Sequence, residues 1–410
     1  MSAIPSPPPS SLPFEEEGTT VFDFDTPLSR LDSHSVKYGL RRAKFGREDV
    51  LPLWVADMDF AAPPCVRQAL AGRVDHPIYG YTLADAGVFE AIMDWQWRRH
   101  GWRVEREWIT LLPGVVPSLD LGVQALTLPG EAVALQPPVY NPLFESAERN
   151  GRRVIRNPLG LVQGRHAMDF DQLEAALTPD TRLFHLCNPH NPGGRAWEQQ
   201  ELERLGDICL RHGLVIISDE IHADLVFPGS RHLPMASLGP DLAARTITLS
   251  SPGKTFNMAG LHTSYAITPD AGLRAKLHDA VHRLHLEGPN LFGLTALKAA
   301  YRYGEPWLAA LLDYLKGNLD LAVAHIARHL PQVRCRAPEA TFLLWLDCRE
   351  WCQARGLDDA TLRQRLVDAG LGLSPGTQFG PEGSGFMRMN VALPRAGLEE
   401  ALARLGRVLG

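Results

Sequence analysis

The sequence lacks long apolar runs and an excess of basic residues. No apolar run approaches the roughly 20 residues that a membrane helix requires. The 410 residues include 41 Lys and Arg against 47 Asp and Glu, which gives a net charge of -6. Surfaces that bind nucleic acid or anionic lipid are basic, so we expect neither partner. Residues 1–12 contain no Lys, no Arg and no apolar segment, so we expect no secretory signal and a cytoplasmic location.

Cysteine is also scarce, with six residues in the chain. Cys348 and Cys352 are close together, but no second pair of Cys or His at zinc-ligand spacing accompanies them. His282 and His285 are spaced for one helix face but have no set of carboxylate partners. We therefore expect free thiols in a reducing cytosol and no metal site.

A chain of this length exceeds one small core, so we expect two lobes. With 45% hydrophobic and 21% charged residues, it is neither disordered nor fibrous. Short apolar runs alternate with amphipathic stretches through the middle of the chain, which is typical of a mostly parallel α/β sheet. The runs expected to be strands are Trp108–Leu112, Ala132–Leu135, Leu183–Cys187, Leu214–Ile217 and Thr246–Leu249. The stretches expected to be helices between them are Pro117–Leu126, Leu143–Arg149 and Glu198–His212.

The end of the chain has a different pattern, which predicts a smaller α+β lobe. Helices over Leu294–Ala300 and Trp307–His329 precede strands at Thr341–Asp347 and Met387–Val391. We predict a Pro- and Ser-rich disordered tail over 1–18. The predicted domains are a large α/β domain over 56–293 and a small domain made of 19–55 and 294–410.

Polar residues follow the expected strands, and ligands of open α/β sheets bind at the carboxyl ends of strands. Gly114 opens a helix where backbone N–H groups suit a phosphate, although such a turn also simply joins two elements. Tyr140 either packs at a rim or stacks on a ligand. Asn188–Gly194 is dense in turn residues. Asp219 either caps a helix or pairs with a buried cation, and Lys254 either lies on the surface or forms a Schiff base.

Gly253-Lys254-Thr255 also suggests nucleotide binding. A phosphate-binding P-loop needs a second glycine five positions before Gly253, where Thr248 stands. No G-x-G-x-x-G motif opens a helix after a strand, so dinucleotide binding is not expected either.

Taken together, these motifs resemble the fold-type I pyridoxal-phosphate enzymes of the class I/II aminotransferase family, over roughly residues 22 to 410. The segments that carry this resemblance are Tyr140, Asn188–Gly194, Ser218–Glu220, Ser251–Thr255 and Phe386–Asn390. A narrower similarity is to the cystathionine β-lyase subgroup often called MalY/PatB-like. It rests on Ser35–Tyr38, Leu53–Phe60, Tyr79–Thr82, Asp219–His222 and Lys254–Leu261. General aminotransferases usually have Tyr in place of His222, Arg in place of His262, and Ser or Ala in place of Gly253.

The resemblance implies pyridoxal 5'-phosphate as cofactor and assigns residues to it. Lys254 would bind it as a Schiff base and then act as general base on the substrate α-carbon. Asp219 would keep the pyridine nitrogen protonated, Asn191 would bind the ring's 3′-oxygen, and Tyr140 would stack on the ring, with His222 beside it. The phosphate would be held by Gly114, Val115, Val116, Ser251 and, from the partner subunit of a homodimer, Tyr81.

The resemblance also implies an amino-acid substrate. Arg388 would bind its α-carboxylate in a two-pronged bond, with Asn191, Ala56 and Asp57 beside it. The expected reaction is β-elimination of a thiol from cystathionine or another cysteine-S-conjugate, which leaves pyruvate and ammonia. The alternatives are an aminotransferase, for which Arg283 is a candidate distal arginine, a specialised C–S lyase of secondary metabolism, and a regulatory binding protein on the same fold.

Overall fold

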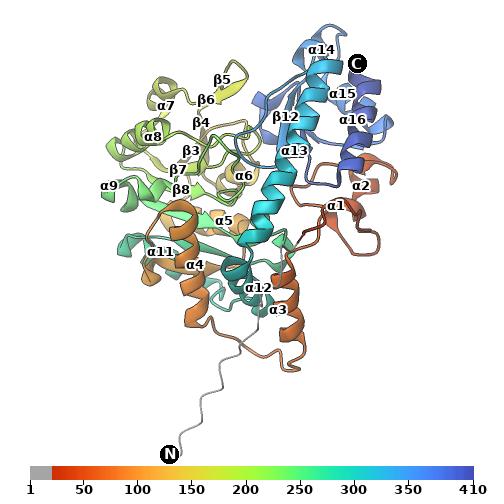
Figure 1. The fold of residues 1–410 in the computed structure, drawn as a ribbon. Helices are drawn as coiled ribbons and strands as arrows, with labels where there is room; N and C mark the ends of the chain where they lie inside the picture. The colour runs from red at the N-terminus through yellow and green to blue at the C-terminus, as the bar shows by residue number, and fades with distance from the viewer. Residues whose placement is uncertain (1–20) are drawn as a thin grey trace, which may run out of the picture.

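The computed structural model describes residues 21–410, so the tail predicted over 1–18 lies outside the described residues. A seven-stranded sheet occupies the centre of one lobe, in the order β2-β10-β9-β8-β7-β3-β4 (Figure 1). All pairs in it are parallel except those that β10 makes with its two neighbours. Its strands are β2 (Ile109–Leu112), β3 (Ala132–Leu135), β4 (Arg153–Arg156), β7 (Thr181–Cys187), β8 (Val215–Asp219), β9 (Thr246–Ser250) and β10 (Ser264–Ile267).

Helices cover both faces of this sheet, as βαβ crossovers require. One hydrophobic cluster joins the strands to α5, α6 and α11, and another joins them to α7, α8 and α9. Because both faces are covered, strands such as Ala132–Leu135 are apolar at every position and fully buried. The covering helices are α5 (Val115–Leu126), α6 (Pro142–Arg149), α7 (Phe170–Ala176), α8 (Gln199–Arg211), α9 (Pro240–Ala243) and α11 (Ala271–Arg283).

The second lobe has a four-stranded antiparallel sheet in the order β11-β12-β15-β14. The long helix α13 (Glu305–His329) runs between the lobes (Figure 1). The strands of this sheet are β11 (Arg334–Cys335), β12 (Leu343–Asp347), β14 (Ser374–Pro375) and β15 (Phe386–Asn390). Its helices are α14 (Arg349–Gln353), α15 (Asp359–Asp368) and α16 (Arg395–Leu409).

The start of the described chain lies against this second lobe. Short helices α1 (Val36–Gly39) and α2 (Arg41–Phe45) precede β1 (Leu51–Pro52), which pairs in parallel with β13 (Leu371–Gly372). Helices α3 (Pro64–Val74), α4 (Ala86–His100) and α12 (Leu291–Tyr303) pack together at the end of the large lobe. Other short elements include α10 (Pro252–Thr255) and the hairpin of β5 (Gly160–Val162) and β6 (Arg165–Ala167).

The mostly parallel α/β fold is confirmed, and the predicted elements differ from the observed ones mainly at their ends. Trp108 belongs to a 3₁₀ turn instead of β2, and Asp219 is the last residue of β8 instead of following it. Two strands of the seven-stranded sheet were not predicted, nor were the short strands β1, β5, β6, β11, β13 and β14. In β4, Arg153 and Arg156 flank only two apolar residues, and β10 returns antiparallel without a crossover helix.

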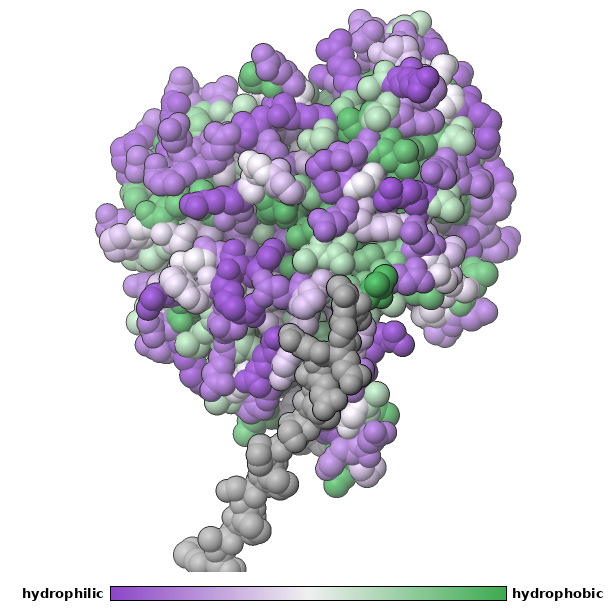
Figure 2. All heavy atoms as spheres, in the orientation of Figure 1, coloured by the Kyte–Doolittle hydropathy of each residue, from purple (hydrophilic) through white to green (hydrophobic). Residues whose placement is uncertain are grey.

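The surface in Figure 2 is mostly hydrophilic with scattered hydrophobic groups. Among residues 21–410, no helix has the length and apolar content to cross a bilayer. In the same range all six cysteines are free, and Cys348 and Cys352 are both buried.

Candidate active site

A cavity of about 1040 Å³ lies at the carboxyl ends of the parallel strands, where the two lobes meet. It brings together side chains from distant parts of the chain, as the sequence predicted for strand ends. Of the residues proposed for the site, those that line it are Ala56, Gly114, Val115, Val116, Tyr140, Asn191, Asp219, His222, Ser251, Lys254 and Arg388. Trp54, His262 and Phe379 line it too, and were not assigned to the site from the sequence.

Lys254 lies on the single turn of α10, directly after β9. Its ammonium group donates to the backbone oxygen of Ala56 at 2.5 Å. Burial and, to a smaller extent, the positive charge of Arg388 lower the pKa of Lys254 to about 8, although Asp57 and Asp219 oppose the shift. A considerable fraction of this amine is therefore neutral near pH 8, as a nucleophile and proton acceptor requires.

Asp219 and His222 lie on the side of the cavity formed by the end of β8. Asp219 is 4% exposed, and burial raises the pKa of its carboxyl to about 6. It accepts a hydrogen bond from the backbone N–H of Ile221 at 3.2 Å. Burial lowers the pKa of His222 to about 3, so its ring is neutral, and its Nδ1 has no partner within the described chain. A buried carboxylate of this kind suits a cationic ligand group.

Arg388 enters the cavity from β15 of the small sheet. It donates to Oδ1 of Asn191 at 3.0 Å and to the backbone oxygen of Trp54 at 2.7 Å, and it lies over the Phe379 ring. Burial lowers the pKa of Arg388 to about 10, so it stays protonated at neutral pH. Its Nε has no hydrogen-bond partner among residues 21–410. A fixed, buried guanidinium with an unused donor suits a carboxylate ligand.

The N-terminus of α5 forms the third part of the cavity. Gly114, the N-cap, has a φ of 154° and no side-chain cap, so the first N–H groups of this twelve-residue helix lack a side-chain partner. Ser251 lies nearby in the lining, and its hydroxyl donates to the backbone oxygen of Thr263 at 2.7 Å and accepts from Gly253 N–H at 3.0 Å. Bare N–H groups with a positive helix end favour a phosphate.

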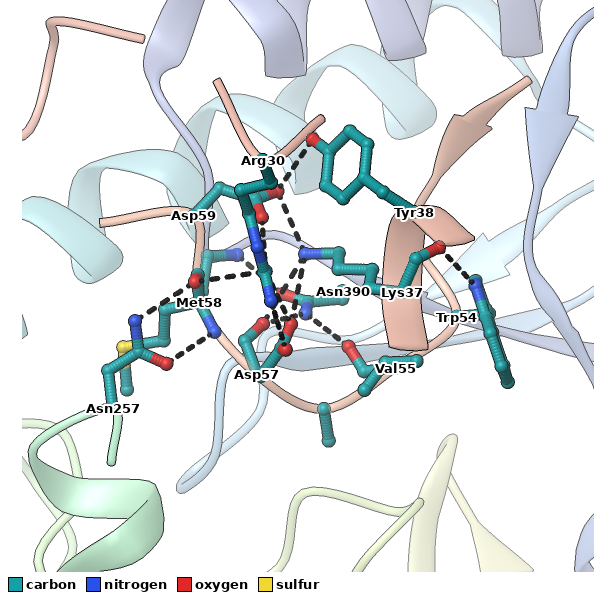
Figure 3. Close-up of polar contacts among 12 residues, drawn as sticks. Arg30, Lys37, Tyr38, Trp54, Val55, Asp57, Met58, Asp59, Asn257 and Asn390 are labelled. Carbon is teal, nitrogen blue, oxygen red and sulfur yellow. Dashed lines mark hydrogen bonds and ion pairs between the residues drawn. The ribbon is translucent and has the colours of Figure 1, made fainter. Parts of the chain in front are cut away.

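Residues 54–58, which we call the strap, supply the backbone oxygens that contact Lys254 and Arg388. Asn390 donates to the oxygens of Val55 and Asp57, at 2.7 and 2.6 Å. Asn257, three residues after Lys254, accepts from Met58 N–H at 3.0 Å and donates to Met58 oxygen (Figure 3). The strap is therefore bonded to both lobes.

An ion cluster of Arg30, Lys37, Asp57 and Asp59 holds the strap from outside the cavity (Figure 3). Lys37 is fully buried and lies 2.8 Å from Asp59 and 3.6 Å from Asp57. Arg30 binds both oxygens of Asp57, at 2.9 and 2.7 Å. Asp57 was expected on the substrate side, but it does not line the cavity, because its carboxylate is committed to these two cations.

Tyr81 also lies outside the cavity of its own chain and is fully exposed. It belongs to the connection between α3 and α4, with the exposed apolar residues Ile78, Tyr79 and Leu83, and the exposed Val74 ends α3 beside it. The projection below α3 in Figure 1 also carries hydrophobic groups in Figure 2.

Comparison with known proteins identifies the family. The model of the family described as aminotransferase class I and II matches residues 48–405. The chain belongs to this family. It is 46% identical over 389 residues to cystathionine beta-lyase PatB of Bacillus subtilis, covering 94% of this chain and 100% of that protein. It is 33% identical to protein MalY of Escherichia coli, covering 94% and 98%.

Solved structures agree with this family assignment. Cystalysin from Treponema denticola, which contains pyridoxal 5'-phosphate, has a TM-score of 0.91 and 31% identity, covering 95% of this chain and 99% of that one. A PLP-bound C-S lyase from Staphylococcus hominis has a TM-score of 0.90 and 30% identity, covering 95% and 98%. The chain therefore has fold-type I, as expected.

Proposed function

We propose that the protein is a pyridoxal-phosphate-dependent C–S β-lyase that cleaves cystathionine or another L-cysteine-S-conjugate to a thiol, pyruvate and ammonia. The observation that carries the proposal is the convergence of Lys254, Asp219, Asn191 and Arg388 on one cavity. The 46% identity to a cystathionine β-lyase over nearly the whole chain supports the choice of reaction. An amino-acid substrate is supported by the buried guanidinium of Arg388.

The cavity fits pyridoxal phosphate. The uncapped start of α5 beside Ser251 suits its phosphate, and the buried carboxylate of Asp219 suits its protonated ring nitrogen. Tyr140 and Asn191 line the same cavity, where Tyr140 would pack on the ring and Asn191 would bind the ring oxygen, while Lys254 offers a partly neutral amine. When bound, the cofactor supplies an aldehyde for amines and a ring that accepts the electron pair left at the substrate α-carbon.

His262 occupies the position where relatives of the aminotransferase type usually have arginine. It lines the cavity with φ 44°, in the left-handed region, so the backbone there is set by its surroundings. No fixed cation replaces that arginine at this position. We propose that backbone N–H groups of Gly114, Val115 and Val116, with Ser251, carry most of the phosphate grip.

The chain's own residues then perform the proton transfer. Arg388, held by Asn191 and the strap, binds the substrate carboxylate and fixes the α-carbon relative to Lys254. The neutral amine of Lys254 accepts the α-proton at Nζ. Asp219, negative when paired with a cation, would keep the ring nitrogen of the bound cofactor protonated. Departure of the β-thiolate, followed by addition of water, then accounts for the thiol, pyruvate and ammonia.

We also propose a homodimer in which Tyr81 reaches the phosphate site of the partner subunit. The support is that Tyr81 is fully exposed and lies in an apolar, exposed connection that a second copy would cover. A cytosolic location is proposed as well, since all cysteines in residues 21–410 are free.

The test is to incubate the purified, cofactor-loaded protein with L-cystathionine and to measure pyruvate and free thiol. We expect both products in equal amounts and neither from Lys254→Ala, which should remain folded by circular dichroism. Amino transfer to a 2-oxo acid without pyruvate would refute the lyase and favour the aminotransferase. Arg283 is exposed and paired with Asp279, outside the cavity, so the structure gives the aminotransferase no distal arginine there.

A further inference from the structure

A second cavity, of about 470 Å³, lies between the two lobes and shares no lining residue with the candidate active site. It is formed by the β5–β6 hairpin, by Gly193–Arg195 and by residues of the small sheet, so both lobes line it. Figure 1 shows the hairpin on the side of the large lobe that faces the small sheet. This volume suits a small organic molecule.

The lining of this cavity is rich in arginine. It includes two acidic residues, Glu339 and Asp347, and five arginines: Arg165, Arg195, Arg334, Arg336 and Arg349. Three carboxylates outside the lining, Glu198, Glu201 and Glu350, pair with Arg165, Arg195 and Arg334, and Asp347 pairs with Arg349. Part of the lining is held in place by ion pairs, since Glu339 binds Arg165 at 2.7 Å and Arg195 at 3.0 Å.

Arg336 differs from these paired arginines. It is exposed, and it forms no ion pair with any residue in the described part of the chain. The chain that follows it is anchored to the large lobe, because the N–H groups of Glu339 and Ala340 both donate to the oxygen of Gly194, at 2.8 and 3.0 Å. Arg336 therefore offers a cationic fork at the mouth of a defined cavity.

Two further groups in the lining have unused polar atoms. His166 is 3% exposed, and neither ring nitrogen makes a hydrogen bond of normal geometry among residues 21–410, although the nearby backbone of Gly160 raises its pKa slightly. Burial, with help from Arg195, lowers the pKa of His166 to about 4, so its neutral ring keeps one N–H donor. The indole N–H of Trp345 is likewise buried and unpartnered in that range. Buried polar atoms without partners are unusual in native proteins.

The rest of the cavity is apolar and flat. Trp345 stacks on Phe386, with ring centroids 5.0 Å apart and planes 9° apart. Leu161 and Leu343 also line the cavity. This surface suits the body of a ligand that has an aromatic or apolar part.

We propose that this cavity binds a small organic anion, whose phosphate or carboxylate group is held by Arg336, beside the buried His166 ring, and whose flat body lies against Trp345. The aromatic side chains of Trp345, Phe379 and Phe386 separate this site from the active cavity. The Phe379 ring lies beneath Arg388 on the active-site side, and Trp345 contacts it edge-on at 5.4 Å.

The test uses the cofactor-loaded protein, so that pyridoxal phosphate already fills the phosphate site proposed for it. The probes are phenyl phosphate, benzoate and inorganic phosphate, and binding is followed by tryptophan fluorescence and by calorimetry. We expect saturable binding of phenyl phosphate and weaker binding of inorganic phosphate, which lacks the flat body. If benzoate binds more tightly than phenyl phosphate, the anionic group of the natural ligand is a carboxylate.

Arg336→Gln should weaken binding of the tighter probe about ten-fold or more, the usual effect of losing a charge-assisted hydrogen bond. The matched control is Arg328→Gln, which alters an exposed arginine on α13, outside this cavity, and should leave binding unchanged. Trp345→Phe should remove most of the fluorescence change. No saturable binding at about 1 mM, or equal weakening in the Arg336 and Arg328 variants, would overturn the proposal. Loss of binding when a substrate carboxylate analogue fills the Arg388 site would place the probe there and would overturn it too. None of these outcomes depends on lyase activity.

Discussion

Replacing Lys37 by methionine tests whether the ion cluster holds the strap. The side chain is fully buried and contacts Asp59 at 2.8 Å, and Asp59 is itself 7% exposed. Breaking a buried ion pair from one side costs about 3 to 5 kcal/mol, because a charge is left without its partner. Asp59 keeps a second cation, Arg30 at 2.7 Å. We therefore expect the lower end, about 3 kcal/mol of unfolding free energy.

The assay is chemical denaturation of the cofactor-free protein, followed by fluorescence and circular dichroism. Arg42→Gln serves as the control, because the Arg42–Glu48 pair is largely exposed with its charges 3.8 Å apart, and such pairs contribute about 0 to 1 kcal/mol. The double variant Lys37→Met with Asp59→Asn should regain part of the loss, since the buried carboxylate that had lost one of its two cations is gone. If Lys37→Met were no more destabilising than Arg42→Gln, the ion cluster would not be a structural anchor.

Three further predictions concern the active cavity. The rate of pyridoxal-phosphate uptake by the cofactor-free protein should rise as the pH passes through about 8 and then level off. The reason is the lowered pKa of Lys254, which makes its amine neutral above that pH. A rate that rises only near pH 10 would contradict this prediction. Burial raises the pKa of Asp219 from 3.8 to about 6, so the folded protein loses stability as the pH rises from about 4 to 6. Asp219→Asn should therefore stabilise the cofactor-free protein at pH 8 by about 3 kcal/mol, and it should remove activity. Melting curves of both proteins at pH 4 and pH 8 check the sign. Arg388→Lys keeps the charge but loses the fork, so kcat/KM for cystathionine should fall about 100-fold, measured from initial rates, with folding intact.

The sequence predicted the α/β core well because its strands are buried on both faces. Continuous apolar runs such as Ala132–Leu135 are distinctive, and the polar residues after them mark the sheet edge where ligands bind. Edge strand β4 has only two apolar residues, between Arg153 and Arg156, and antiparallel β10 follows β9 without a crossover helix. Their existence depends on pairing with neighbours that are far away in the sequence.

The candidate site was predictable where one residue type carries the chemistry, as with Lys254 and Asp219. It was not predictable where the role of a side chain depends on which other side chain it contacts. Asp57 stands in a motif that suggested substrate contact, yet its carboxylate turns to Arg30 and Lys37. Phe379 carries no local signal, and its place under Arg388 follows only from the packing of the small lobe.

The parallel pairing of Leu51–Pro52 with Leu371–Gly372 has a consequence for synthesis of the protein. On the ribosome, the early residues that carry the strap emerge long before β13 and β15, whereas the seven-stranded sheet is complete by Ile267. Domains usually fold as they emerge. A nascent chain can therefore have a complete large sheet, with Lys254 and Asp219 in position, before its amino-acid pocket exists. The pocket forms only when the last translated segment supplies Arg388 and pairs with the strap-bearing segment at the start of the chain.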